Sequence, residues 1–178
     1  MADKGDVLRQ GDTDTMVFRA TAADTGGAYL EVEATYGPMG DLRPPPHYHP
    51  HQEEHFTVLS GALSVRVGDE HRTLTAGSEL VVPRQVPHAM WNEGDEPTTF
   101  RWRTTPAQRT EHMFEVFWGL VADGRMGRHG SPRPALLQSM AMMWSFRREW
   151  RLTSPPYPVA LPLCAVLAVP ARLLGHRA

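Results

Sequence analysis

The sequence predicts a mainly β protein, with one antiparallel β-barrel or sandwich of jelly-roll type followed by two or three α-helices. From residue 16 to residue 103 the chain consists of short runs rich in β-branched and aromatic residues, each cut by Gly, Pro or Asp. Many short strands at regular spacing are typical of such a fold. After Thr105 the apolar residues recur at helical spacing instead. The 178 residues suffice for one domain with a substantial core.

Eight segments are candidate strands. In one of them, Leu63, Val65 and Val67 alternate with polar residues, which is the period of a half-buried strand. The dipeptide Gly68-Asp69 that follows predicts a hairpin turn, because both residues tolerate unusual backbone dihedrals. The candidate strands are 16–19, 28–36, 55–60, 63–68, 70–74, 79–82, 89–92 and 98–103.

The segment after the strands predicts helices. Phe114, Phe117, Trp118 and Val121 recur at the spacing of one helical face. A loop rich in Gly, Arg and Pro follows over 123–134, and residues 135–150 predict a second helix. Its expected apolar face consists of Leu137, Met140 and Trp144.

A third helix is expected to begin near Pro162, since proline is tolerated in a first turn. It lies in the most apolar stretch, 159–174, which contains Pro162, Pro170 and Arg172. A bilayer-spanning helix needs roughly 20 apolar residues, so we expect no stable membrane insertion. We expect the helix to pack on the barrel or on a dimer partner, with a membrane-surface contact as the alternative. Its apolar stripe consists of Leu163, Val166, Leu167, Leu173 and Leu174.

These patterns divide the chain into a polar segment 1–15, which is a tail or an edge strand, a barrel 16–104 and a helical extension 105–178. The net charge of −2 is uneven, because residues 1–104 carry 9 basic and 16 acidic residues, whereas 105–178 carry 9 and 4. The basic extension has no lysine, and Arg147-Arg148 is its only adjacent basic pair. We therefore expect solvated arginines and contacts to the acidic half rather than nucleic-acid binding.

Cysteine content and the amino-terminal composition bear on the compartment. A single cysteine, Cys164, excludes an internal disulfide and a site built from several thiolates. The first residues are polar and lack the apolar stretch of a signal peptide, so we expect a cytoplasmic protein. The preference for Arg, with Lys4 as the only lysine, is typical of a GC-rich bacterial genome.

The stretch 46–61 contains the residues with the clearest chemistry. His47 and His49 are two apart, so in an extended chain both side chains point the same way. Glu54 can return to that face if the chain turns at 50–53 and then begins a strand. Imidazole nitrogens with a carboxylate oxygen suit first-row divalent metals. The alternative is a polar surface loop that happens to be rich in histidine.

A second stretch, 77–92, has a Gly turn, an apolar strand, a Pro break and then His88. Together the two stretches resemble the paired motifs of the cupin superfamily, and fifteen residues separate Gly61 from Gly77. Two positions depart from the motifs: Asp41 and Gln85 stand where glycines are expected, so the turn at Gln85 need not use a positive φ. The matching residues are His47, His49, Glu54 and Gly61 of the first motif, and Gly77, Pro83, His88 and Asn92 of the second.

The resemblance implies a β-barrel that holds one divalent transition metal ion (Fe, Mn, Ni, Co or Zn) in its wider mouth. The implied ligands are His47, His49, Glu54 and His88, with the histidines neutral and open positions left for substrate and water or O₂. Glu54 is also the candidate catalytic base, if it moves between the two roles. His51 is expected beside the site or at the surface.

A cavity with the metal at its base is expected to accept a small aromatic or polyketide-like organic substrate. The alternative is that its apolar residues only form core. The expected lining shares the inward parity of the ligands or adds an aromatic wall, and consists of Phe56, Val58, Met90, Asn92, Phe100 and Trp102.

Because cupins have many activities, three functions stay open. The first is a metal-dependent dioxygenase. The second is a non-oxidative metal-dependent cyclase or isomerase, and the third is a non-catalytic small-molecule-binding or sensor protein. We further expect a homodimer, formed through barrel edges and the apolar helical stripe. The last helices are alternatively a lid over the barrel mouth.

Overall fold

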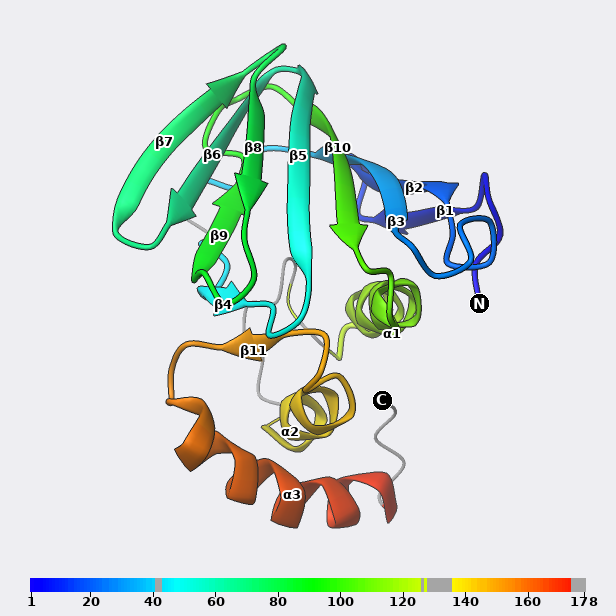
Figure 1. The fold of residues 1–178 in the computed structure, drawn as a ribbon, viewed down its shortest axis with the longest axis vertical. Helices are drawn as coiled ribbons and strands as arrows, with labels where there is room; N and C mark the ends of the chain where they lie inside the picture. The colour runs from blue at the N-terminus through cyan, green and yellow to red at the C-terminus, as the bar shows by residue number, and fades with distance from the viewer. Residues whose placement is uncertain (41–42, 126, 128–135, 174–178) are drawn as a thin grey trace.

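The computed structural model describes residues 1–40, 43–125, 127 and 136–173. Its strands form two antiparallel sheets, which confirms the predicted fold class (Figure 1). The first sheet has the order β1-β2-β3-β10-β5-β8, and the second has the order β11-β4-β9-β6-β7. The strands are β1 Val7–Gln10, β2 Asp14–Ala20, β3 Leu30–Tyr36, β4 His47–Tyr48, β5 Glu53–Ser60, β6 Ala62–Val67, β7 Glu70–Thr75, β8 Glu79–Val82, β9 His88–Trp91, β10 Thr98–Thr105 and β11 Arg151–Leu152.

Alternation along the strands places the core between the two sheets. In β2, β3 and β10 every second residue is buried, as period-two patterning requires. Phe18, Val32, Phe56 and Phe100 are fully buried there. The β6–β7 hairpin closes through Gly68-Asp69 with Val67 opposite Glu70, so the predicted turn is confirmed.

Three helices follow or flank the barrel: α1 Thr110–Ala122, α2 Leu136–Ser145 and α3 Tyr157–Leu173. The apolar face predicted for the first helix is confirmed in part, because Phe114 and Trp118 are buried whereas Phe117 and Val121 are half-buried. The Phe114 ring lies 4.9 Å from the ring of Trp102 on β10, which attaches α1 to the first sheet. Among the described residues, no helix has both the length and the apolar character needed to cross a bilayer.

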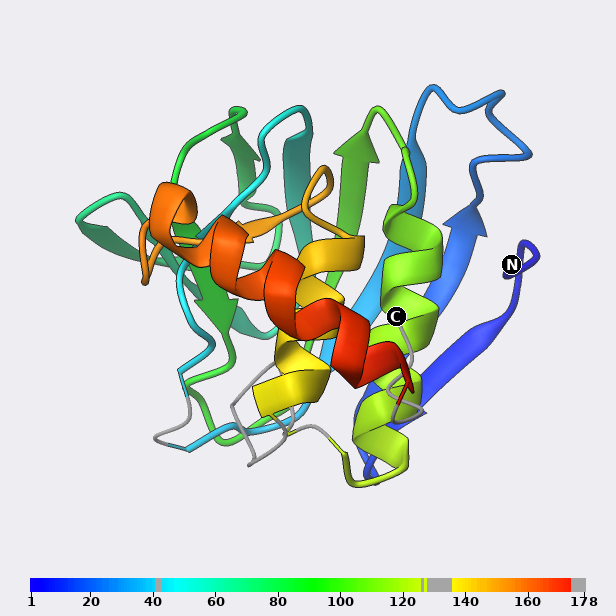
Figure 2. The same cartoon turned by 90° about the horizontal axis from the view of Figure 1, so that it is seen from below.

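The helix pair α2–α3 lies beyond the end of the barrel where β4 is found, and α3 crosses in front of α2 when the molecule is seen from below (Figures 1 and 2). α2 ends at Ser145, before the predicted residue 150, because residues 149–153 instead pair with the barrel. α3 begins at Tyr157 and continues through Pro162, so the prediction that it starts near Pro162 was wrong. A proline inside a helix removes one backbone hydrogen bond without always ending the helix.

The buried faces of these two helices differ from the predicted ones. α2 buries Gln138, Ala141 and Met142 rather than Met140 and Trp144, which are half-buried. On α3 the buried residues are the small ones, Ala160, Cys164 and Ala168, whereas Leu163 and Val166 are 49% and 70% exposed. Small side chains let two helix backbones approach closely, so volume rather than hydrophobicity determined which face packs. The side chains of Leu137, Leu173 and Leu174 lie outside the described residues.

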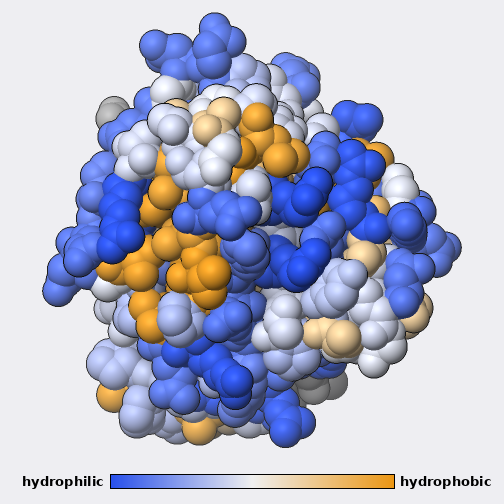
Figure 3. All heavy atoms as spheres, turned by 45° about the horizontal axis from the view of Figure 1, so that its top comes forward, coloured by the Kyte–Doolittle hydropathy of each residue, from blue (hydrophilic) through white to orange (hydrophobic). Residues whose placement is uncertain are grey.

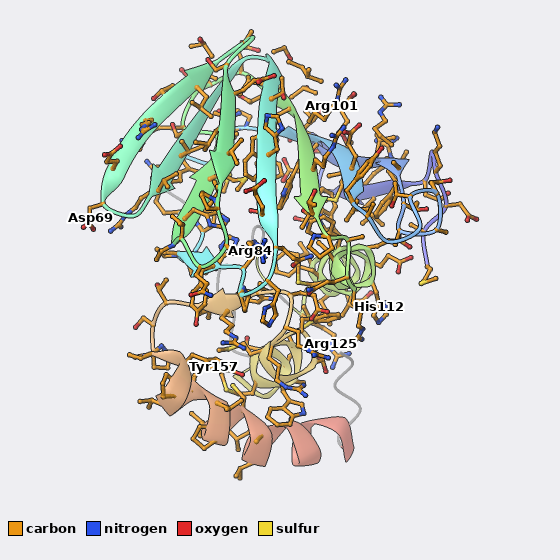
Figure 4. The ribbon with its side chains drawn as sticks, viewed as in Figure 1. Asp69, Arg84, Arg101, His112, Arg125 and Tyr157 are labelled. Carbon is orange, nitrogen blue, oxygen red and sulfur yellow. The ribbon has the colours of Figure 1, made fainter. Side chains whose placement is uncertain are left out.

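Most of the face shown in Figure 3 is hydrophilic, with apolar residues gathered left of centre. The predicted polar segment 1–15 contains β1, which is the edge strand of the first sheet. Figure 4 shows Arg84, on the loop between β8 and β9, at the barrel end nearest the α2–α3 pair.

Candidate metal centre

Four side chains that the sequence analysis identified as candidate ligands lie together at the end of the barrel nearest the α2–α3 pair. His47, His49, Glu54 and His88 each offer one ligand-type atom, and these atoms all lie within 4.8 Å of one another. Their rings are close as well, with the centroids of His47 and His88 4.5 Å apart. His49, Glu54 and His88 are almost completely buried. Such a cluster can hold one metal ion.

Sheet register brings these residues together. His47 on β4 stands directly opposite His88 on β9. After the turn that follows β4, β5 begins and places Glu54 inward, opposite Val82 of β8. His55 points to the other side of the strand, where its Nε2 lies 3.6 Å from Glu79. His51 is exposed, in keeping with its expected surface position.

Backbone carbonyls fix the orientation of the three imidazoles. His49 Nδ1 lies 2.7 Å from the carbonyl oxygen of Glu149, and His88 Nδ1 lies 2.9 Å from that of Val86. His47 Nδ1 makes a longer contact, 3.4 Å, with the carbonyl of Pro45. Because a carbonyl oxygen only accepts hydrogen bonds, each Nδ1 carries the hydrogen when the ring is neutral. The Nε2 lone pairs are then left for the cluster, as metal binding requires.

The carboxylate of Glu54 lies among these nitrogens. Its Oε1 accepts a hydrogen bond of 2.9 Å from the indole Nε1 of Trp102 and lies 3.2 Å from His49 Nε2. Its Oε2 lies 2.8 Å from His88 Nε2. Despite this distance, Glu54 Oε2 and the Nε2 atoms of His49 and His88 have no well-directed hydrogen bond within the described part of the chain.

Buried lone pairs that face one another repel unless a proton or a cation lies between them. Three imidazole nitrogens and one carboxylate oxygen are a donor set that first-row divalent ions accept. The residues present therefore fit a single divalent transition metal ion. The set is less suited to Mg²⁺ or Ca²⁺, which prefer oxygen ligands.

The pKa shifts within the cluster also favour binding of a cation. Burial would raise the pKa of Glu54, but His49 and His88 hold it well below its usual range. Burial would lower the pKa of His49, but the Glu54 carboxylate and the Glu149 carbonyl together outweigh it and the pKa is raised. For His47, burial together with the neighbouring His88 and His49 lowers the pKa well below its usual range. These directions favour an ionised Glu54, a neutral His47 and a proton on His49 that a bound cation would replace.

The predicted pocket residues Phe56, Val58, Met90, Asn92, Phe100 and Trp102 are all buried. Two of them have specific contacts that the sequence did not indicate. Trp102 donates to Glu54, as described above. The Asn92 amide donates to the carbonyls of Tyr36 and Glu96 and accepts from Gly94 N, so it holds the loop after β9. Whether these residues line a substrate cavity stays a prediction.

The two departures from the sequence motifs have different outcomes. The turn at Gln85 does use a positive φ, of 64°, so the expectation that it need not do so was wrong. The backbone N–H of Gln85 donates a hydrogen bond of 2.8 Å to the carbonyl oxygen of His49. This bond stabilises the turn against the energetic cost of the left-handed conformation. Asp41 lies outside the described residues, and the adjacent Gly40 has a φ of 55°.

Sequence reasoning missed the contribution of residues 149–153. Glu149 supplies the carbonyl on His49, and β11 pairs with β4. No local pattern marks these residues, since their partners are about 100 positions away and the segment is too short for a periodic signal.

Residues 35–102 match the family model described as "Cupin domain". With the two antiparallel sheets and the paired motifs, this match shows a cupin domain over residues 35–102. Among solved structures, an RmlC-like cupin from Shewanella frigidimarina is similar, with a TM-score of 0.50 at 17% identity over 62% of this chain and 92% of that one. That likeness supports the fold alone.

Three curated proteins are similar in sequence. Protein SchB of Streptomyces halstedii is 37% identical over 49% of this chain and 60% of its own length. An oxidoreductase of Arthrobotrys oligospora is 38% identical over 65% and 46%, respectively. The polyketide synthase CurC of Streptomyces cyaneus is 35% identical over 43% and 54%. The chain thus spans about half the length of the curated relatives it matches.

Proposed function

We propose that this protein is a mononuclear metal-dependent enzyme that acts on a small, polyketide-like or aromatic substrate, with dioxygenase as the leading activity. The observation that carries the proposal is the cluster of three imidazole nitrogens and one carboxylate oxygen, which all lie within 4.8 Å of one another. The names of two relatives, an oxidoreductase and a polyketide synthase, support the reaction type and the substrate class respectively.

His47, His49, Glu54 and His88 would hold the ion, which we propose to be Fe, Mn, Ni, Co or Zn. When bound, such an ion supplies Lewis-acid polarisation of a substrate oxygen and, if it is redox-active, activation of O₂. The carbonyls of Glu149 and Val86 keep the Nε2 atoms of two ligands directed at the ion. Trp102 restrains Glu54, which favours a role for this carboxylate as a fixed ligand over a mobile base.

Buried aromatic side chains beside the ligands would position a flat substrate and exclude water. Phe56 and Phe100 lie next to Trp102 on the inner face of the first sheet, with ring centroids 5.4 and 6.4 Å from the indole. Exclusion of water strengthens electrostatic interactions at the reacting atoms. A non-oxidative cyclase or isomerase is the second candidate, because the same ion would stabilise an enolate and one relative is named a polyketide synthase.

The test is O₂ consumption by the Fe(II)-loaded protein with aromatic diols and linear or cyclic β-diketones, together with mass analysis of the products. Oxygen uptake that depends on substrate, with product masses increased by two oxygen atoms, is expected for a dioxygenase. Products of unchanged or dehydrated mass without oxygen uptake would support the cyclase or isomerase. Retention of an unchanged ligand would instead support a non-catalytic binding protein. His88→Ala is the matched inactive control.

We infer a homodimer as the working assembly. On α3, Val159, Leu163 and Val166 are 62%, 49% and 70% exposed, and their i, i+4, i+7 spacing places them on one face of the helix. A second copy would cover this apolar face. Sedimentation of the wild type beside Leu163→Glu tests the assembly, and a monomer at all concentrations would contradict it.

A further inference from the structure

The segment 149–153, which we call the C-terminal strap, lies against the residues that carry two of the proposed ligands. Its first residue, Glu149, accepts the 2.7 Å hydrogen bond from His49 Nδ1. Its second residue, Trp150, places its ring edge-on to His47, with centroids 6.0 Å apart and planes at 88°. Two imidazoles of the cluster are therefore contacted from outside the matched cupin domain, residues 35–102.

The rest of the strap continues this contact as a short antiparallel ladder. Arg151 pairs with Tyr48 and Leu152 pairs with His47. The backbone N–H and the side-chain hydroxyl of Thr153 both donate to the carbonyl of Pro46, each over 3.1 Å. Every residue of the strap thus touches the ligand-bearing stretch 46–49.

The strap also contacts the two neighbouring helices, at its start and at its middle. At its start, the backbone amides of Glu149 and Trp150 donate to the carbonyl of Phe146, a fully buried residue just after α2. At its middle, the guanidinium of Arg151 lies 3.6 Å from the ring centroid of Tyr157, the first residue of α3. Figures 1 and 4 show β11 between the barrel and the two helices, with Tyr157 below it.

These contacts matter because β4 is only two residues long. Apart from β11, β4 pairs with β9 alone, through a single register pair. Without β11, β4 would be a two-residue edge strand, and such a strand is weakly specified in position. The strap therefore supplies the second partner that fixes where His47 and His49 lie.

We propose that the C-terminal strap is part of the metal centre and that Trp150 is a positioning residue for the ligand His47. This inference rests on the proposed metal site. Strap docking and metal binding then stabilise each other, because coupling between two binding events is reciprocal. Residues that orient metal ligands from outside the ligand set typically change metal affinity 10–100-fold when mutated.

The test uses the full-length protein and Zn²⁺, with affinity measured by competition against a chromophoric chelator. Trp150→Ala is expected to weaken Zn²⁺ binding about tenfold or more. Trp150→Phe, which keeps an aromatic edge beside His47, is expected to recover most of the affinity. Trp118→Ala is the control, because this buried tryptophan lies on α1 rather than beside the strap.

Hydrogen exchange of the wild-type protein gives a second readout that does not depend on any variant folding. Adding Zn²⁺ is expected to slow exchange at the Thr153 amide, which bonds to Pro46, more than at amides of the β6–β7 hairpin. Circular dichroism of each variant shows whether a loss of affinity is only a loss of fold.

The outcomes separate the two proposals. If the wild type binds Zn²⁺ while exchange in the strap is unchanged, or if folded Trp150→Ala binds as tightly as folded Trp118→Ala, the role of the strap is overturned and the metal site stands. If the wild type binds neither Zn²⁺, Co²⁺ nor Fe²⁺, both proposals fail.

Discussion

The indole of Trp102 and the carboxylate of Glu54 form a hydrogen bond of 2.9 Å inside the barrel, where water does not compete. A charge-assisted bond of this kind fixes the carboxylate rotamer and occupies one lone pair of Oε1. Trp102 therefore has a polar role in addition to its packing in the core, and this role can be tested with one aromatic substitution.

Trp102→Phe keeps an aromatic ring in the core but removes the donor to Glu54. We expect Zn²⁺ affinity to fall about tenfold, because a released ligand must be ordered again on binding. The affinity is measured by chelator competition, with Trp118→Phe on α1 as the control for loss of a buried indole. Equal affinities of the two variants would show that the hydrogen bond has no role in metal binding.

Proton release follows from the raised pKa of His49. Burial acts against this rise and is the largest single influence, but the Glu54 carboxylate and the Glu149 carbonyl together outweigh it, so the metal-free imidazole holds its proton to a higher pH than usual. A histidine binds a metal as the neutral imidazole, so binding has to displace this proton and should weaken as the pH falls. Calorimetric Zn²⁺ titrations near neutral pH, in buffers of different ionisation enthalpy, are expected to show net proton release. Identical heats in all buffers would contradict the assignment.

At the scale of the elements, the strands of the barrel were predictable because their own residues determine them. All eight candidate strands are present, and 79–82 has the predicted bounds. Alternation in segments such as 63–67 and the Gly68-Asp69 turn are local signals, and they coincide with the global fold. Strand parity indicated His47, His49 and Glu54, whereas His88 and the complete set of four were implied by the resemblance to the paired cupin motifs.

The elements that were missed are defined by partners rather than by their own sequence. β4 and β11 contain two residues each and exist through pairing with each other across about 100 positions. The packed face of α3 was also mispredicted, because Ala160, Cys164 and Ala168 carry little hydrophobic signal beside Leu163 and Val166. Close helix approach depends on side-chain volume, which a hydrophobicity pattern does not report.

The motif glycine Gly61 gives a prediction about the β5–β6 turn. It has a φ of 76°, and a Cβ at this position would lie 2.8 Å from the carbonyl oxygen of Pro97. Gly68 has a φ of 59° but open space around it. We expect Gly68→Ala to cost about 1 kcal/mol from backbone strain alone. Gly61→Ala should cost clearly more, because backbone at 97–98 must also move.

Urea unfolding of the two glycine variants measures both costs. A Gly61→Ala variant as stable as Gly68→Ala would mean that the contact with Pro97 relaxes freely, contrary to this account.

At the scale of the whole molecule, the barrel and the helical extension share one site. The expected electrostatic contact between them is not the main link, since described arginines of the extension such as Arg147 and Arg151 bond to backbone carbonyls within it. The strap joins the two parts instead, through β11 and the carbonyl of Glu149. The division of the chain at 104/105 stays a prediction about sequence organisation, and the proposed metal centre would extend across it.

Because the cluster forms only in the folded state, a bound ion should stabilise the entire chain. At a free Zn²⁺ concentration 100-fold above Kd, the expected gain is about 2.7 kcal/mol. For a chain of this size that corresponds to a rise in Tm of roughly 5–10 °C. Thermal unfolding with and without Zn²⁺ measures the rise, and His88→Ala should abolish it. An equal rise in this variant would place the bound ion elsewhere.

The central claim is that His47, His49, Glu54 and His88 hold one divalent transition metal ion. The most direct test is elemental analysis of the protein purified without an affinity tag, beside a His49→Ala, His88→Ala double variant. We predict about one equivalent of Fe, Mn, Ni, Co or Zn in the native protein, lost in the variant. Native protein that contains none of these metals, and takes up none on incubation with their ions, would contradict the claim and leave a metal-free ligand-binding barrel.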